Sequence, residues 1–326
     1  MINEVKLSRF QFLPTLKETI FCLLAWCFWF AVTVGFIGFR PEHLFLVFLI
    51  ASCFFFNGST RKFLVAVLPF IIFGISYDWM NLLPNYEVNP VDTEGIYSLE
   101  KTLFGISVGG ELLSPNEYFA LNTNPVSDFL SGFFYLCWVP VPILFGFYLY
   151  FSKKTELYLH FSLVFLFVNL LGFGIYYLHP AAPPWYVALY GFDFIPGTPG
   201  NVAGMGAFDQ MTGLNIFDTL YARNANVFAA LPSLHSAYPF IAFVYSLRKK
   251  VPLAWKIILG IITVGIWYGA VYSSHHYIID VSAGVLVSVA GILIFEKVLM
   301  SFSGFRRFIN TYCAYISLKK TQEVNK

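Results

Sequence analysis

The sequence predicts an all-α membrane protein, a polytopic bundle of transmembrane helices with about eight spans. Apolar residues make up 58 % of the 326 residues and charged residues only 12 %, and the mean hydropathy is +0.68. These values lie well outside the soluble average. The apolar residues also fall into long runs, and a helix needs about 20 mostly apolar residues to cross a bilayer. The two observations together exclude a soluble globular domain.

The apolar runs are separated by short polar or charged turns, for example near 58–62, 152–156 and 248–251. In chain order, we expect helices near residues 18–39, 41–57, 62–78, 128–151, 157–178, 228–247, 252–272 and 276–299. The second and third runs are short, so they could form one re-entrant or tilted pair. We divide the chain into N-terminal spans with a first outer loop (1–127), a membrane domain that carries the polar motifs (128–300) and a basic tail (301–326).

Basic residues are distributed unequally between the two sides of the membrane. With eight spans, 17 of the 20 lysines and arginines lie on the side of both termini, and only Arg40, Lys101 and Arg223 lie on the other. Cytoplasmic loops carry the excess of basic residues, so both termini are expected in the cytoplasm. The two long loops, 79–127 and 179–227, are then expected on the non-cytoplasmic side, which is periplasmic or lumenal.

Polar residues gather at the non-cytoplasmic ends of four of these spans. The stretch HPAAPPWY (179–186) follows the fifth span, AALPSLHSAYP (229–239) opens the sixth, and SSHHYIIDVSAG (273–284) joins the seventh to the eighth. An ionisable side chain in a span costs about 2.5–3.5 kcal/mol on insertion scales and by default indicates function. Because the three stretches lie on one side of the membrane, we expect them to form one site.

The spacing of His276 and Asp280 predicts a reactive imidazole. Residues four apart lie on one helix face, one turn from each other. The carboxylate can accept a hydrogen bond from one imidazole nitrogen and leave the other free as a base or nucleophile. His235 comes from another helix and could transfer a proton to the leaving oxygen. We therefore expect His276 to react, Asp280 to orient it, His235 to act as acid, and His275 to line the site.

The start of the sixth helix is the expected phosphate site. Pro232 suits the first turn of a helix, where its missing N–H costs nothing. The amides of Ser233, Leu234 and His235 would then point outward from the helix N-terminus, which favours a phosphate oxygen. This stretch therefore predicts one half of a phosphate-handling site.

A metal site is an alternative interpretation of the same side chains. His179, His235, His275, His276 and Asp280 could converge on one ion. Membrane di-iron oxygenases use more histidines than the six found here, in repeated HxxHH-type boxes that usually face the cytoplasm. We therefore expect no metal and no other cofactor.

The motifs PSLHS and HHYIID together resemble the second and third signature motifs of the type 2 phosphatidic acid phosphatase superfamily. HPAAPPWY, AALPSLHSAYP and SSHHYIIDVSAG are similar to its inositolphosphotransferase branch, which contains the inositol phosphorylceramide synthases. The resemblance covers residues 175–285 well and is weaker at 97–105 and 128–140. It implies a six-helix phosphatidic acid phosphatase type 2-like core and makes 128–300 the catalytic membrane domain.

The resemblance also implies a phosphohistidine mechanism. His276 would attack the phosphorus of a lipid phosphodiester, oriented by Asp280, and His235 would protonate the departing diacylglycerol oxygen. His235 would then act as base for an incoming lipid hydroxyl, such as that of ceramide. The implied partners are a phosphatidylinositol-like donor and a ceramide-like acceptor in the membrane, with no metal and no nucleic acid.

The sequence departs from the wider superfamily at the cationic residues that hold phosphate. It lacks a KxxxxxxRP motif, and positions 269–270 are Gly-Ala where the broader pattern has Ser-Arg. A singly charged phosphodiester needs less positive charge than a doubly charged monoester, which favours headgroup transfer over the alternative, a lipid phosphate phosphatase.

A transporter would show repeated halves or charges buried in mid-span, and the sequence shows neither.

Arg223 is the candidate replacement for the missing cations, because it is the only basic residue of the second outer loop. His179 is the second candidate. Together with Ser233, His275 and Tyr277, these residues are expected to bind the substrate.

Overall fold

The computed structural model describes residues 14–222 and 226–318. Helices make up most of this part of the chain, and its single sheet is an antiparallel hairpin of β1 (Ile106–Val108) and β2 (Glu111–Leu113). The all-α fold class predicted from the sequence is therefore confirmed.

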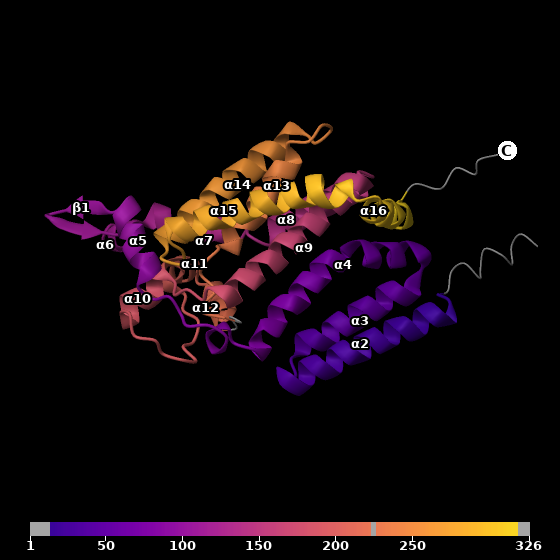
Figure 1. Cartoon of the computed structure of the whole chain (residues 1–326), viewed down its shortest axis with the longest axis horizontal. Coiled ribbons are helices and arrows are strands. Elements are labelled where there is room, and N and C mark those ends of the chain that lie inside the picture. The colour runs from indigo at the N-terminus through magenta and orange to yellow at the C-terminus, as the bar shows by residue number, and fades with distance from the viewer. Residues whose placement is uncertain (1–13, 223–225, 319–326) are drawn as a thin grey trace, which may run out of the picture.

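Within the described residues, a helix or helix pair lies at each of the eight predicted positions and follows the long axis of the bundle (Figure 1). They are α2 (Leu16–Phe36), α3 (Pro41–Phe56), α4 (Gly58–Trp79), the pair α7 (Pro125–Tyr135) and α8 (Pro140–Phe151), α9 (Thr155–Leu178), α13 (Leu234–Ser246), α14 (Leu253–Tyr272) and α15 (Ile278–Leu293). Five of them are long and apolar enough to cross a membrane, or six if α7 and α8 form one span with a 43° bend. The protein is an integral, multi-pass membrane protein.

Helix α13 lies at the centre of the bundle and packs against α9, α14 and α15. Its residues Ala237, Ile241, Ala242 and Tyr245 are completely buried. The N-terminal helices α2 and α3, indigo in Figure 1, lie at one edge, and α4 connects them to the core by packing on α9. The helix that carries His235 is therefore enclosed by protein and has little contact with lipid.

The loop elements gather at one end of the bundle, on the left in Figure 1. The first outer loop contributes α5 (Gly95–Phe104), the hairpin, α6 (Pro115–Leu121) and short 3-10 turns at Met80–Leu82 and Asn85–Glu87. The second contributes α10 (Pro184–Tyr190), a 3-10 turn at Ala203–Met205, α11 (Gly206–Thr212) and α12 (Ile216–Tyr221). Both long loops thus lie at the same end, as the span count requires.

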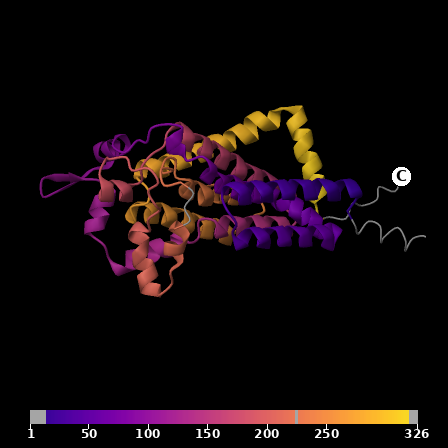
Figure 2. The same ribbon diagram turned by 90° about the horizontal axis from the view of Figure 1, so that it is seen from below.

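The opposite end contains the start of α2 and the C-terminal helix α16 (Ser303–Ile316), which leaves the last span at an angle (Figure 2). A π-helical turn (Ile294–Val298) and a 3-10 turn (Leu299–Ser301) connect α15 to it. On α16, Ile309 and Ile316 are buried whereas Arg306 and Arg307 are exposed. This amphipathic helix within the basic tail was not predicted from the sequence.

Two spans differ from their predicted boundaries. The fourth is broken between α7 and α8, because Pro140 lacks the N–H that would bond to the carbonyl of Leu136 four residues earlier. The sixth begins at Leu234, not at residue 228, because the Ser233 hydroxyl caps the helix by accepting from the amide of Ser236 at 3.3 Å. Pro232 therefore precedes α13 instead of opening it, and the helix has 13 residues.

Candidate active site

The two histidines of the PSLHS and HHYIID motifs are in direct contact. His235 lies in the first turn of α13 and His276 lies just before α15, with His235 Nδ1 3.0 Å from His276 Nε2. At this distance one nitrogen donates a proton and the other accepts it. His276 is only 4 % exposed. His235 is partly buried, so the pair is a mostly buried, hydrogen-bonded unit formed by the start of α13 and the segment just before α15.

Two hydrogen bonds hold the starts of α13 and α15 together, and one glycine allows their close approach. The amide of Ser233 donates to the backbone oxygen of Asp280 at 2.9 Å, and the Ser236 hydroxyl donates to the carbonyl of Val281 at 3.1 Å. Gly284 lies where the helices touch, because a Cβ at this position would overlap the Ser233 carbonyl oxygen and the Ser236 hydroxyl. The spacing of the histidine pair thus depends on a residue without a side chain.

Asp280 is completely buried in the first turn of α15. Its Oδ2 accepts from the backbone amide of Tyr277 at 2.8 Å and lies 3.6 Å from His276 Nδ1. That distance is longer than a hydrogen bond, yet neither His276 Nδ1 nor Asp280 Oδ1 has another hydrogen-bond partner among the described residues. Contacts of this kind tighten when substrate binds. Asp280, His276 and His235 therefore lie in a row, with one nitrogen of His276 facing each neighbour.

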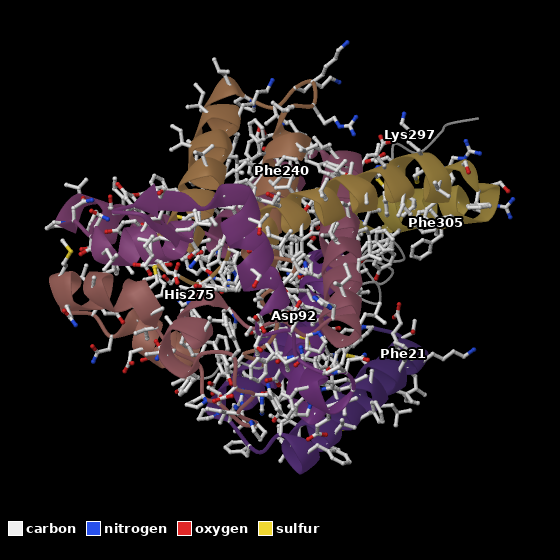
Figure 3. The ribbon with its side chains drawn as sticks, turned by 60° about the vertical axis from the view of Figure 1, so that its left-hand side comes forward. Phe21, Asp92, Phe240, His275, Lys297 and Phe305 are labelled. Carbon is white, nitrogen blue, oxygen red and sulfur yellow. The ribbon has the colours of Figure 1, made fainter. Side chains whose placement is uncertain are left out.

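His275 lies beside this row, in the interior of the loop-bearing end (Figure 3). Its Nε2 is 3.0 Å from the carbonyl oxygen of Val202, and its ring stacks on that of Tyr221 at 4.4 Å between centroids. Burial, and the neighbouring His276, lower the pKa of His275 to about 3. His275 is therefore neutral, donates its proton to Val202, and forms a wall of the site.

Two cavities meet at His235. The smaller, which we call the polar cavity, has a volume of about 70 Å³; its walls include His235, His275 and His276 with residues of the second outer loop. The larger, which we call the apolar cavity, has about 310 Å³ and lies between α4, α9, α12, α13 and the turn between α7 and α8. Four residues line both, namely Tyr77, Tyr176, Tyr221 and His235. His235 can therefore contact a polar group on one side and an apolar group on the other.

Comparison with known proteins matches residues 111–294, more than half of the chain and both histidine motifs, to the PAP2 superfamily. The chain belongs to the PAP2 superfamily. The chain is also similar to the phosphoinositol dihydroceramide synthase of Bacteroides thetaiotaomicron, with 54 % identity over 306 residues. This match covers 93 % of this chain and 100 % of the relative.

More distant relatives are fungal. The chain is 27 % identical over 248 residues to the inositol phosphorylceramide synthase catalytic subunit AUR1 of Saccharomyces cerevisiae, a match that covers 72 % of this chain and 57 % of the relative. It is 27 % identical over 280 residues, 77 % of this chain and 55 % of the relative, to the inositol phosphorylceramide synthase of Candida albicans. No solved structure matches at a significant level. These relatives confirm the branch that the motifs resemble, and this PAP2 protein is an enzyme.

The first outer loop of this PAP2 enzyme supplies two buried side chains that hold the backbone around His276. Glu100 on α5 accepts from the amides of Ile278 at 2.9 Å and Ile279 at 3.1 Å. Asn116 on α6 donates to the carbonyl of His276 at 3.0 Å and to a carbonyl at the end of α14 at 2.8 Å. Burial raises the pKa of Glu100, and the two amide bonds act in the opposite direction. Neither residue was predicted from the sequence.

Glu100 and Asp280 together occupy the N-terminus of α15. Glu100 accepts from the amides of residues 278 and 279, and Asp280 accepts from that of Tyr277. At the N-terminus of α13, the Ser233 amide is bonded to Asp280. The expectation that this amide would hold a phosphate oxygen is therefore wrong.

Several expected substrate-binding residues do not line either cavity. His179 is half-exposed and its Nε2 lies 3.3 Å from Oδ2 of Asp92. Ser233 caps α13. Tyr277 is 1 % exposed and packs against apolar residues. These three residues support the surrounding structure instead, and Arg223 lies outside the described residues.

The described residues contain no group of three or more His, Cys, Asp or Glu side chains that could hold a metal ion. His179 pairs with Asp92 and takes no part in the contact between His235 and His276. The five side chains considered as metal ligands therefore do not converge.

Proposed function

We propose that the protein transfers a phosphoinositol headgroup from a phosphatidylinositol-like phospholipid to the hydroxyl of a ceramide-like lipid. The observation that carries the proposal is the buried row of Asp280, His276 and His235, which opens into a polar cavity on one side and an apolar cavity on the other. The relatives named as phosphoinositol dihydroceramide synthase and inositol phosphorylceramide synthase support the headgroup and the acceptor.

One tautomer of His276 fits both of its neighbours. With the proton on Nδ1, the ring faces the Asp280 carboxylate and leaves Nε2 as the acceptor of a proton from His235 Nδ1. The same Nε2 lone pair is then the nucleophile. Because this nitrogen is already hydrogen-bonded to His235, the substrate phosphate must separate the two rings when it binds.

In the first half-reaction, Nε2 of His276 forms a bond to phosphorus and the bond to the diacylglycerol oxygen breaks. His235 enters this step as an imidazolium with both ring nitrogens protonated, donates one proton to that oxygen and becomes neutral. Asp280 stabilises the positive charge on the His276 ring. In the second, His235 takes the proton of the acceptor hydroxyl, the hydroxyl oxygen attacks phosphorus, and the phosphorus–nitrogen bond breaks. Both histidines return to their starting states, and no redox step is needed.

The charge of the cavities supports a phosphodiester substrate. Among the described residues, no lysine or arginine lines either cavity, whereas a phosphomonoester with two charges would require cations. We propose Arg223 as the cation that contacts the phosphate. Tyr221, two residues before it in the sequence, lines both cavities.

We further propose that the site faces the non-cytoplasmic side. The motif residue His275 lies at the loop-bearing end, whereas Lys297 and Phe305 lie apart from it on the C-terminal helices (Figure 3). The excess of basic residues therefore belongs to the end away from the histidine pair.

The test is reconstitution of the purified protein in vesicles that contain phosphatidylinositol and ceramide, with lipid products measured by mass spectrometry. We expect inositol phosphorylceramide and an equal amount of diacylglycerol, and loss of both in His276→Ala. The control is His160→Gln, which changes a histidine paired with Glu296. Release of free phosphate or inositol phosphate without a new sphingolipid would show a phosphatase or phospholipase instead.

A further inference from the structure

Gly74 lies in the second half of α4. No neighbouring element packs so closely against it that a glycine would be required there. Glycine in a helix interior is less favourable than alanine, so it usually marks a close approach of another element. Gly172 on α9 is such a case, because a Cβ there would lie 2.7 Å from Leu234. A Cβ on Gly74 would meet no atom within 4 Å. The protein itself therefore does not use the space above Gly74.

Gly74 lies between two apolar spaces. On one side it lines the apolar cavity, together with His235. On the other it lines a second space of about 370 Å³ between α3, α4 and α8, which we call the lipid-facing groove and which is lined by Leu46, Ile50, Phe70, Ile143 and Phe147 among others. Of the described residues, Gly74 alone lines both. The two spaces approach each other only where α4 has no side chain.

We propose that the hydrocarbon chain of the lipid alcohol at His235 lies across α4 at Gly74, from the apolar cavity into the lipid-facing groove. This inference rests on the proposed function, because the proposed mechanism places the alcohol oxygen at His235. The apolar walls fit a hydrocarbon chain and exclude the polyol headgroup, which is left on the other side of His235, toward His275 and His276. A chain that moves in from the bilayer leaves surroundings as apolar as the cavity, so its binding depends on close packing and on a path that no side chain obstructs.

The same path serves both half-reactions. His235 protonates the departing diacylglycerol oxygen and later deprotonates the acceptor hydroxyl, so both oxygens occupy one position at different times. The chain attached to each oxygen then leaves that position in the same direction. Gly74 is therefore a residue that determines specificity for the chains of both donor and acceptor.

The test compares Gly74→Leu with Gly174→Leu in vesicles. Gly174 on α9 is a matched control, because a Cβ there also meets no atom within 4 Å and it lines neither the apolar cavity nor the groove. Each variant is assayed with a long-chain ceramide and with a truncated ceramide whose two chains are both short. The donor is varied in the same way, since in a ping-pong mechanism kcat/KM of each substrate reports its own half-reaction.

We expect Gly74→Leu to lower kcat/KM at least about tenfold for the long-chain donor and acceptor, equivalent to about 1.4 kcal/mol, chiefly through KM. Truncated substrates should stay within about twofold of the unchanged protein, and Gly174→Leu should stay within about twofold for all substrates. Gly74→Ala, which fits the helix better than glycine, should fold at least as well and give a smaller loss.

Three results would overturn the inference. An equal loss with long and truncated substrates would mean that the leucine damages the site itself. Full activity of Gly74→Leu with long chains would mean that no chain passes Gly74. A loss confined to the donor or to the acceptor would refute a shared path. Failure of the proposed function is distinguishable from all three, because the unchanged protein would then form no inositol sphingolipid from any acceptor.

Discussion

Replacing Gly284 with alanine tests how closely α13 and α15 must approach for the histidine pair to work. The new Cβ would lie 3.0 Å from the carbonyl carbon of Ser233 and closer still to its oxygen. A carbon and a carbonyl oxygen that are not bonded lie about 3.3–3.6 Å apart, so the closer oxygen would require α15 to withdraw by roughly 1 Å. Because the obstructing group is backbone, rotation of a side chain cannot relieve the overlap.

This withdrawal would separate His276 from His235, since the two rings are attached to the starts of the two displaced helices. A displacement of about 1 Å in a reacting group can lower a rate about 100-fold. We therefore expect Gly284→Ala to lower kcat of headgroup transfer by about 100-fold. Overpacking of this kind also lowers the free energy of unfolding by about 1–3 kcal/mol, which leaves room for a folded but slow enzyme.

The assay is the initial rate of sphingolipid formation in vesicles, with the unfolding temperature measured on the same preparation. Gly174→Ala is the control, because its new Cβ meets nothing within 4 Å; its rate should not change. If Gly284→Ala keeps more than about a third of the activity and unfolds normally, the spacing of α13 and α15 does not control the reaction.

The remaining predictions address the orienting carboxylate, the support from the first loop, the phosphate cation and the topology. Asp280→Asn should lower kcat at least about 100-fold in a folded protein, because the amide stabilises the wrong imidazole tautomer; a loss under tenfold would contradict its role. Glu100→Ala should lower both kcat and the unfolding temperature, since each buried amide left unpaired costs about 1–3 kcal/mol. Glu100→Gln should recover part of the loss, and Glu94→Ala, an exposed neighbour, should have no effect. Arg223→Ala should lower kcat/KM at least about tenfold and Arg223→Lys should recover only part; full activity of the alanine variant would move the phosphate contact elsewhere. A cysteine placed in loop 187–200 should react with an impermeant reagent from the non-cytoplasmic side, while a C-terminal tag reports the cytoplasm; the reverse pattern would place the site inside the cell.

The positions of the spans could be predicted because a membrane helix is recorded in the sequence as one continuous apolar run. The joint location of PSLHS and HHYIID could also be predicted, because span number alone decides the side on which a motif lies.

The start of α13 was predicted wrongly because two local rules conflict there. Proline favours the first helical turn, which would start the helix at Pro232, and serine favours the N-cap. In the structure Ser233 is the N-cap and the helix starts at Leu234.

Glu100 and Asn116 could not be found from local pattern. Each is one of several polar residues on a short loop helix, and its partner lies far away in the chain. No periodicity or motif spacing connects the two. The weak resemblance at 97–105 was the only signal, and Glu100 precedes the region matched to the PAP2 superfamily.

The long sequence separation of these contacts has a consequence for biosynthesis. Asn116 is made 160 residues before His276, and Glu100 is made 178 residues before Ile278. At a synthesis rate of about 5–20 residues per second, the interval is about 10–35 s. Throughout that time the first outer loop has no backbone of α15 to bind. Under the proposed mechanism, the nascent chain is therefore catalytically silent until its last span is inserted, and a ribosome that stalls before this point leaves an inert membrane anchor.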